Sequence, residues 1–349
     1  MNADPLLPDL PAAVMIGLAV LVLSLLVIVH EAGHLVAAKL AGVKVLEFGV
    51  GFPPRLFGRE WRGTRYSLNA IPFGGFVRML GESGESNAEG SFTASPRRVR
   101  ALILLAGPAM NLLLAPLLFM GGSMIADLSG AEISSVVPDS PAGAAGLRLG
   151  DVIVRVGDRV VEEPADLAMY ERSHGGERVR LEVLRGSARL AYQVLLRLEH
   201  PEDQGPLGIT VRAHLAPAGL AKAMARGLER GLESFALLPR HLGEAAAGRS
   251  TLEVSGPVGI VTAVGEAARR GPEVLLFLAG LLTAQLGIIN LLPWPVLDGG
   301  RLLLLGVEAV RGRRLQVGQE GAINFVGMLI LLLLAVMITV GDVQRLSGG

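Results

Sequence analysis

Four long apolar runs dominate the hydrophobic pattern of the chain, and polar, glycine-containing stretches separate them. A helix needs about 20 apolar residues to cross a hydrocarbon core of roughly 30 Å. The first run has no basic residue before it and is too long for a signal peptide, so we expect it to be retained. The pattern predicts a polytopic α-helical membrane protein with four spans, approximately at Ala12–Ala38, Val99–Ile125, Glu273–Leu292 with an apolar continuation to Val310, and Ala322–Val340.

The pattern changes after the first span, where apolar and polar positions alternate as they do in strands. The segments "VLEFGVGFPPRLFG" and "TRYSLNAIPFGGFVRML" carry this alternation, with glycine and proline at their turns. They predict paired strands near the membrane surface. The next stretch, "GESGESNAEGSFTASP", is polar and has no period, which predicts a flexible loop.

Short strand patterns and Gly-rich turns follow the second span, with one short helix expected near Ala165–Arg172. Together they predict a compact inserted domain of about 70 residues. The stretch "SPAGAAGLRLGDVIVRVGDRVV" resembles the PDZ domain of bacterial proteases, which binds peptides as an added edge strand. A small β domain that serves only as a spacer is the alternative.

An amphipathic helix is predicted after the insert, ending before Pro239. We expect it to lie on the outer leaflet, against the PDZ-like domain, or as a connector packed on the insert. Its apolar positions recur every three or four residues, at Leu220, Met224, Leu228, Leu232, Phe235 and Leu238.

The composition supports a membrane protein, because 51% of the 349 residues are hydrophobic and only 18% are charged, against about 25% in soluble proteins. Thirty-two basic residues balance 32 acidic ones, so the net charge indicates no nucleic-acid partner. The chain has no cysteine, which excludes disulfides, thiolate metal sites and cysteine nucleophiles.

The placement of lysine and arginine predicts the orientation, because short cytoplasmic loops are rich in these residues. A dense basic group lies between the first two spans, and Arg311, Arg313 and Arg314 lie between the last two. We therefore expect these loops in the cytoplasm, and both termini and the insert outside. The predicted division is 1–40 first span, 41–98 cytoplasmic-side β element and loop, 99–127 second span, 128–200 PDZ-like domain, 201–272 amphipathic helix and linker, 273–310 broken third span, 311–321 cytoplasmic loop and 322–349 fourth span and tail.

The first span contains "VIVHEAGHLVAA", in which His30, Glu31 and His34 form an H-E-x-x-H pattern. Residues four apart share one helix face, so both imidazoles reach one ion while Glu31 approaches a water on that ion. This is the geometry of a zinc protease. An ionisable group near the centre of a membrane helix costs about 2.5–3.5 kcal/mol and is usually functional. A polar pore or packing cluster is the alternative.

A catalytic zinc usually has three protein ligands, so a third buried His, Asp or Glu is needed. The other four histidines lie in the outer insert. Asp298 is the better candidate, because it lies in "NLLPWPVLDGG", where Pro293 and Pro295 interrupt the third span. A broken helix at membrane depth is tolerated mainly where it lines a cavity.

The H-E-x-x-H pattern together with N-x-x-P-x-P-x-L-D-G resembles the two signature motifs of the site-2 protease family of intramembrane zinc metalloproteases. "GPAMN" (residues 107–111) and "SGPVGI" (residues 255–260) also resemble that family, and the resemblance covers essentially the whole chain. The single PDZ-like insert and four spans resemble the bacterial branch that cleaves anti-sigma factors and remnant signal peptides. Better-known members of that branch carry two PDZ domains.

The resemblance implies one Zn²⁺ per chain, held by His30, His34 and Asp298, with Glu31 as general base. Bound zinc activates water and polarises the scissile carbonyl, and Glu31 moves the proton to the leaving amine. Asn290 is neutral, so we expect it to hold the substrate backbone or the developing oxyanion rather than the metal. Arg301 stands where some relatives have histidine, which should not affect the ligand set.

The strand-like segments Phe48–Phe52 and Ile71–Phe76 resemble the membrane-associated β element of the family. We expect them to pair with a substrate helix that has unwound locally, because a helical peptide bond is shielded. The substrate-binding candidates are Phe48, Gly49, Gly51, Phe73, Gly74, Pro293 and Pro295.

The resemblance also implies partners and a location. The expected partners are the lipid bilayer and transmembrane protein substrates that another protease has already trimmed, in regulated intramembrane proteolysis. The expected location is the bacterial inner (cytoplasmic) membrane, as a multi-pass protein with the active site toward the cytoplasmic side.

Other classes fit the sequence less well. A serine protease needs a Ser and a His facing each other in the bilayer, and an aspartyl protease needs two opposed aspartates, of which only Asp298 qualifies. A metal-binding membrane transporter or scaffold with a PDZ recognition module is the remaining alternative. Transporters often have internal repeats and paired broken helices, whereas this sequence shows one broken helix and no repeat.

Overall fold

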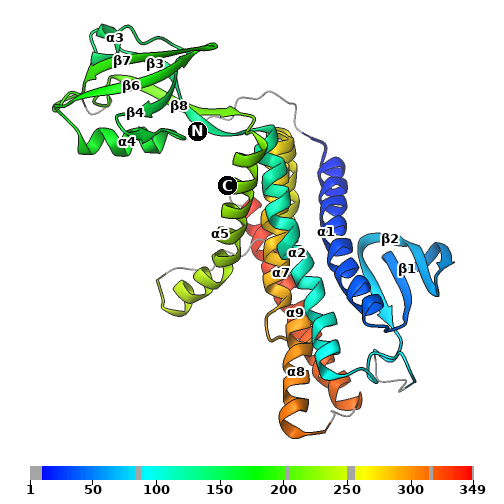
Figure 1. Cartoon of the computed structure of the whole chain (residues 1–349). Coiled ribbons are helices and arrows are strands. Elements are labelled where there is room, and N and C mark those ends of the chain that lie inside the picture. The colour runs from blue at the N-terminus through cyan, green and yellow to red at the C-terminus, as the bar shows by residue number, and fades with distance from the viewer. Residues whose placement is uncertain (1–9, 83–87, 202–203, 250–255, 314–316, 348–349) are drawn as a thin grey trace. The chain divides into compact units, whose positions relative to one another are not determined.

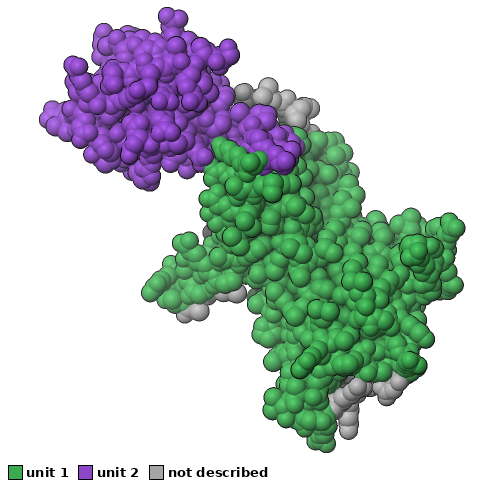
Figure 2. Space-filling model, viewed as in Figure 1, with its two compact units in different colours: residues 1–122, 221–349 green, residues 123–220 purple. Residues whose placement is uncertain are grey.

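The computed structural model describes residues 10–82, 88–201, 204–249, 256–313 and 317–347 of the chain. The chain forms two compact units, which Figure 2 shows in different colours. The first unit joins two parts of the chain, Met1–Gly122 and Ala221–Gly349, and the second is the segment between them, Ser123–Leu220. The second unit is therefore an insertion into the first.

Four helices among the described residues are long and apolar enough to cross a membrane, as the four apolar runs predict. In hydrocarbon the backbone polar groups must be satisfied within the helix itself, which is why uninterrupted apolar runs become long helices. The helices are α1 (Ala12–Leu40), α2 (Arg97–Ile125), α7 (Pro272–Asn290) and α9 (Val317–Ser347) (Figure 1).

The third span is broken between α7 and a further helix, α8 (Asp298–Arg311). The segment 291–297 between them contains both prolines of the motif and folds tightly over the start of α8. A Cβ atom at Gly299 would overlap the Leu291 carbonyl oxygen, and one at Gly300 would overlap the Trp294 carbonyl oxygen. The two glycines therefore allow the turn that presents Asp298 at the first position of α8.

An ion pair holds the far half of α8 against α2. Arg100 Nη1 donates to Glu308 Oε2 at 2.9 Å, and both side chains are largely buried. Arg97 adds a second bond, from its Nη2 to the Glu308 carbonyl oxygen at 3.2 Å. The first half of the broken span is held by α2 as well, through a small core of Ala115, Phe119 and Ala284.

The alternating segments form an antiparallel hairpin of β1 (Val45–Trp61) and β2 (Thr64–Met79), which lies beside α1 (Figure 1). Buried apolar side chains from both elements join at its base, including Ala38, Val45 and Met79. The paired strands that the sequence predicts are thus present.

The polar stretch after β2 contains one buried aromatic residue that its composition does not predict. Residues 83–87 lie outside the described residues, and within 88–96 the side chains of Ser91 and Phe92 are buried. Phe92 is 4% exposed within the core that contains Ala38 and Met79, and its N–H donates to the Leu80 carbonyl oxygen at 2.8 Å. A single aromatic anchor has no period, so the sequence pattern does not reveal it.

The second unit is a six-stranded sheet in the order β7-β6-β4-β3-β8, with β5 paired to β4. Its core contains Ile133, Ile153 and Leu181 of the sheet and Leu167 of α4 (Pro164–Ser173). The predicted domain end at residue 200 differs from the structure, because β8 pairs with β3 in the same sheet. The elements are β3 (Asp127–Val136), α3 (Pro141–Ala144), β4 (Val152–Val156), β5 (Arg159–Val160), α4 (Pro164–Ser173), β6 (Arg178–Arg185), β7 (Ala188–Leu195) and β8 (Ile209–Ala216).

The predicted amphipathic helix is α5 (Leu220–Ala246), and it continues through Pro239 instead of ending before it. Small residues form its packed face: a Cβ at Gly227 or Gly231 would overlap or crowd Pro116 of α2. Gln285 of α7 donates to the Ser234 carbonyl oxygen at 2.9 Å. The helix therefore packs on α2 and α7, while most of its apolar stripe stays exposed, at Leu220, Met224, Leu228 and Leu232.

A helix that the sequence pattern did not predict, α6 (Pro257–Arg270), lies in the expected linker. Asp342 of α9 holds its first turn, because Asp342 Oδ2 accepts the Gly259 N–H at 2.9 Å. A carboxylate that caps a helix start from a distant part of the chain leaves no local capping signal. The motif "SGPVGI" begins at Ser255, which lies outside the described residues.

Candidate metal centre

Helix α1 supplies two histidines whose rings meet in the interior of the first unit. His30 and His34 are each 6% exposed, and their Nε2 atoms lie 3.2 Å apart. Helix α2 passes very close at this point, because a Cβ at Gly33 would overlap the Ala106 carbonyl oxygen and one at Gly107 would overlap His34. The two glycines therefore make the room in which both rings fit.

The other ring nitrogen of each histidine is anchored by α2. The Ile103 carbonyl oxygen lies 2.8 Å from His34 Nδ1 and can only accept, so His34 carries its proton on Nδ1 and a lone pair on Nε2. The Asn111 amide lies 3.2 Å from His30 Nδ1.

The buried Asn111 side chain indicates which ring nitrogen of His30 carries the proton. Its Oδ1 is buried without a hydrogen-bond partner among the described residues. The two ends of an amide are interchangeable by a simple turn, which lets Oδ1 accept a proton from His30 Nδ1. Both histidines then direct an Nε2 lone pair at the same point.

Asp298 reaches this point from the start of α8. Its Oδ2 lies 3.0 Å from His30 Nε2 and 3.3 Å from His34 Nε2, and it is buried without any hydrogen-bond partner among the described residues. The three possible ligand atoms lie within 4.8 Å of one another. Ligands of a tetrahedral zinc at about 2.0–2.2 Å stand roughly 3.4 Å apart, so the donor set fits a single zinc ion.

Glu31 is held between α1 and the hairpin. Its Oε2 accepts the Val77 N–H of β2 at 3.0 Å. Ser24, two helical turns earlier on α1, accepts the Gly74 N–H at 3.1 Å and donates to the Pro72 carbonyl oxygen at 3.1 Å. Residues seven apart share a helix face, so β2 docks along the face of α1 that carries Glu31.

The candidate substrate residues of the hairpin occupy different surroundings. Gly49 faces Phe76 in the register, and a Cβ there would overlap the Phe76 ring. Gly51 and Gly74 have positive φ values of 74° and 70°, which glycine adopts without steric cost. Phe73 is 51% exposed, so it is available for contact. Phe48 packs near Tyr66 within the hairpin, with ring centres 6.1 Å apart.

The remaining candidates lie on or beside the break in the third span. Asn290 is the last residue of α7, and its Nδ2 donates to the Leu286 carbonyl oxygen of the same helix at 2.9 Å. Pro295 packs against Gly327 of α9, where a Cβ would overlap the proline ring. Pro293 lies in the same turn segment. The structure thus brings together His30, His34 and Asp298, with Glu31 on the next residue of α1.

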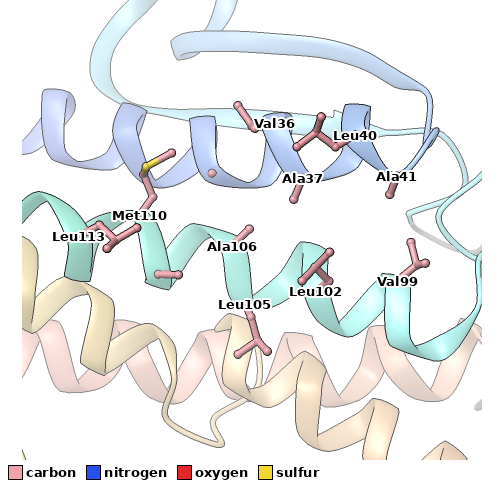
Figure 3. A pocket seen from close by; sticks show the side chains of 12 residues that line it. Val36, Ala37, Leu40, Ala41, Val99, Leu102, Leu105, Ala106, Met110 and Leu113 are labelled. Atoms are coloured by element: carbon pink, nitrogen blue, oxygen red, sulfur yellow. The ribbon is translucent and has the colours of Figure 1, made fainter.

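A groove of about 580 Å³ lies along α1 and α2 beside the histidines (Figure 3). Apolar side chains of both helices line it, among them Val36, Leu40, Leu102 and Leu113, and Gly33 is the residue nearest the histidines in sequence. Among the described residues, the side chains that line this groove include no ionisable group.

Three residues of the site had no role assigned from the sequence. Gly107 and Asn111 lie in "GPAMN", which resembles a family motif but carries no periodic or chemical signal of its own. The sequence analysis assigns no role to Ser24. A polar residue seven positions from Glu31 within an apolar span was the available signal for a docked strand.

Comparisons with known proteins indicate the family of the chain. The chain matches the model of peptidase family M50 over residues 18–334. It is 34% identical over 333 residues to a predicted zinc metalloprotease of Clostridium perfringens, covering 93% of this chain and 97% of that protein. It is 28% identical over 415 residues to the zinc metalloprotease RasP of Oceanobacillus iheyensis, covering 94% and 98%. The PDZ domain of an SdrC-like protein from Listeria monocytogenes matches 24% of this chain and 87% of that chain, with 24% identity and a TM-score of 0.22.

Proposed function

Because the chain belongs to peptidase family M50, we propose that it hydrolyses a peptide bond within the transmembrane segment of single-span membrane proteins. It is a zinc metalloendopeptidase and a multi-pass membrane protein. One observation carries the proposal. Two histidine nitrogens and a carboxylate oxygen converge within 4.8 Å, and both histidines belong to a helix that is long and apolar enough to cross a membrane.

His30, His34 and Asp298 are the proposed ligands of one zinc ion per chain. When bound, zinc activates a water molecule and polarises the scissile carbonyl. The chain prepares the ligands for this role, since Ile103 and Asn111 fix the ring orientation and Asp298 adds the negative charge. Groups that orient metal ligands in this way typically contribute about 10–100-fold in metal affinity or activity.

Glu31 is the proposed general base. It takes a proton from the attacking water at a carboxylate oxygen and delivers it to the leaving amine nitrogen. The Val77 N–H donates to Oε2 of this carboxylate, so the Glu31 side chain is oriented before the substrate binds. Positioned acid–base groups of this kind contribute about 10²–10⁴-fold to the rate.

The hairpin is the proposed substrate platform. Residues 47–50 of β1 are paired on both sides, with 65–68 and with 75–78 of β2, so the outer edges at 55–61 and 71–79 are the ones that an unwound substrate segment could pair with. Gly51 and Gly74 adopt positive φ without a side chain, and the half-exposed Phe73 would provide an apolar contact. Phe48 and Gly49 lie in the doubly paired part of β1, where they would support this edge from behind. Asn290 would bind the substrate backbone after its amide turns away from the Leu286 carbonyl oxygen. Pro293 and Pro295 of the following turn segment would support it.

The proposed substrates are of the anti-sigma factor or remnant signal peptide type, trimmed by another protease beforehand, in regulated intramembrane proteolysis. The proposed location is the bacterial inner membrane, with the basic loops in the cytoplasm and both termini and the insert outside. A folded insert on the outer side would exclude substrates that still carry a bulky outer domain.

The deciding experiment compares wild type with Glu31→Gln, using purified protein, zinc analysis and single-span model substrates. We expect the variant to keep its zinc while cleavage falls by at least about 10²-fold. Glu266→Gln is a matched control, because Glu266 is exposed on α6 and pairs with Arg270 of the same helix. Unchanged cleavage by Glu31→Gln would remove Glu31 from the mechanism. Zinc transport into vesicles without any cleavage by wild type would favour the transporter instead.

A further inference from the structure

Helix α9 contacts the rest of the first unit at few positions. Between residues 321 and 330, Asn324 and Gly327 are the only residues that are not exposed. They are three apart and therefore share one helix face. Asn324 is also a polar residue in an otherwise apolar stretch of a candidate membrane span, where polar side chains are costly and usually have a purpose.

Both residues contact the turn segment between α7 and α8. Asn324 Oδ1 accepts the Val296 N–H at 3.3 Å, and Trp294 Nε1 donates to the Gly327 carbonyl oxygen at 3.3 Å. A Cβ at Gly327 would overlap the Pro295 ring, so a larger residue could not lie there without a shift. One turn of α9 therefore holds three consecutive residues of the turn segment.

Val296 has an unusual backbone conformation. Its φ is +82°, and it is one of two non-glycine residues with positive φ among the described residues. A β-branched side chain strongly disfavours this region, so the conformation persists only where neighbouring groups impose it. Two residues later Asp298 begins α8 with its carboxylate against His30 and His34.

We propose that Asn324 is a positioning residue for the metal centre, which holds Val296 in the left-handed conformation and thereby places the Asp298 carboxylate beside the two histidines. The fourth membrane helix then completes the zinc site without supplying a ligand. This inference rests on the ligand set proposed above. It assigns to Asn324 a role in metal affinity that mere packing of α9 does not require.

The test measures zinc affinity of the purified full-length protein by competition with a chromogenic chelator. In Asn324→Leu, which has a similar size but no acceptor, the dissociation constant for zinc should rise about 10-fold. The visible absorption bands of the cobalt-substituted protein should also shift, because one ligand is no longer fixed. Thr339→Val on the same helix is the control, since the Thr339 hydroxyl donates to the Ala335 carbonyl oxygen of its own helix, and it should behave as wild type.

A rescue variant separates positioning from general stability. Glycine adopts positive φ without steric cost, so Asn324→Leu combined with Val296→Gly should return the zinc dissociation constant to within about 3-fold of wild type. A loss that Val296→Gly does not repair would overturn the inference. So would an equal loss in Asp342→Leu, which releases α9 from α6 at its other end.

Two further results complete the test. If Asn324→Leu does not fold, Asn324→Ala takes its place with the same expectation, and an unchanged zinc affinity in the folded variant contradicts the inference. His30→Ala and Asp298→Ala test the ligand set separately. If these variants retain zinc with wild-type affinity, the proposed metal centre itself is wrong, whatever Asn324→Leu shows.

Discussion

Two buried aspartates, one in each unit of the chain, have opposite surroundings. Asp151 of the inserted unit accepts two bonds from the Arg185 guanidinium, at 2.7 and 2.8 Å, and one from the Arg148 N–H at 2.9 Å. Asp298 of the first unit faces His30 and His34, and its Oδ2 has no hydrogen-bond partner among the described residues. A buried carboxylate requires a cation or several donors to remain charged.

The difference distinguishes a buried acid that stabilises the fold from one that is a candidate metal ligand. The inserted unit supplies the cation for Asp151 from its own chain, so this carboxylate completes the fold of the sheet. Around Asp298 the chain supplies two imidazole rings, and the second ring nitrogen of each lies against Ile103 or Asn111 of α2. The cation proposed to bind Asp298 is a zinc ion, because zinc suits two imidazoles and a carboxylate.

The largest effect that tests this comparison is expected from Asp298→Asn. The amide keeps the shape but removes the charge, so zinc affinity should fall by more than the roughly 10–100-fold typical of groups that only orient a ligand. Cleavage should fall with it. Asp151→Asn, the same change in the other unit, should leave zinc content and cleavage unchanged. If the two variants behaved alike, the distinction between the two aspartates would fail.

Asn111→Leu should give the next largest effect. It removes the side chain that contacts His30 Nδ1 while keeping a similar volume, so the ring can rotate and zinc affinity should drop about 10–100-fold. Zinc competition measures the change. Asn69→Leu is the matched control, because Asn69 is also buried but donates to the Gly51 carbonyl oxygen in the hairpin. Equal losses in both variants would attribute the Asn111 effect to general instability.

The sequence predicted the parts of this site that local geometry determines. His30 and His34 must share a face because they are four apart on a helix, and two prolines must end α7 before Asp298. The four spans follow from long apolar runs, and the β1–β2 hairpin follows from the alternation of apolar and polar positions. The roles of the proposed ligands and of Glu31 stay predictions until zinc and turnover are measured.

The sequence did not predict the parts that depend on distant contacts. Gly107 and Asn111 matter only because α2 crosses α1 at Gly33. Strand β8 joins the sheet only by pairing with β3, about 80 residues earlier, as in the Ala131 and Ala213 pair. Phe92 likewise anchors a loop whose composition is otherwise polar. Each of these features depends on a contact with a residue far away in the sequence, which no local sequence pattern predicts.

A smaller effect, on the stability of the inserted unit, is expected at Glu171. This residue adds a third buried acid to the two aspartates. Burial raises the pKa of Glu171 from 4.5 to about 7, against the opposing effect of His200. Between these values the folded insert holds a proton that the unfolded chain has released, so its stability is full below pH 4.5 and declines as the pH rises through 7. Glu171→Gln should remove a decline of roughly 2–3 kcal/mol over this range.

The decline is measurable on the full-length protein as the urea concentration at which a protease first cuts the insert. Glu177→Gln is a control, because Glu177 is exposed at the end of the same helix–strand connection. A wild-type midpoint that does not change between pH 5 and pH 7.5 would show that Glu171 is solvated or paired, and that a buried acid without a cation need not be unusual in this unit.

The smallest effect is expected at Asp151, and its pH dependence has the opposite sign. Burial by itself would raise the pKa of Asp151, but the Arg185 guanidinium and the Arg148 N–H hold it below its usual value of 3.8. Its contribution is therefore present above pH 3.8 and is lost as the pH falls through the lowered value. Asp151→Asn should destabilise the insert by about 1–2 kcal/mol at neutral pH, because charge-assisted bonds are lost. The same urea and protease measurement should show that the stability difference between wild type and Asp151→Asn is unchanged down to about pH 5 and shrinks below pH 3.8. The variant Asp139→Asn is the control, because Asp139 is exposed.

A stability difference that persisted at low pH would mean that Asp151 acts through its shape and not its charge. The contrast with Asp298 would then rest on packing alone.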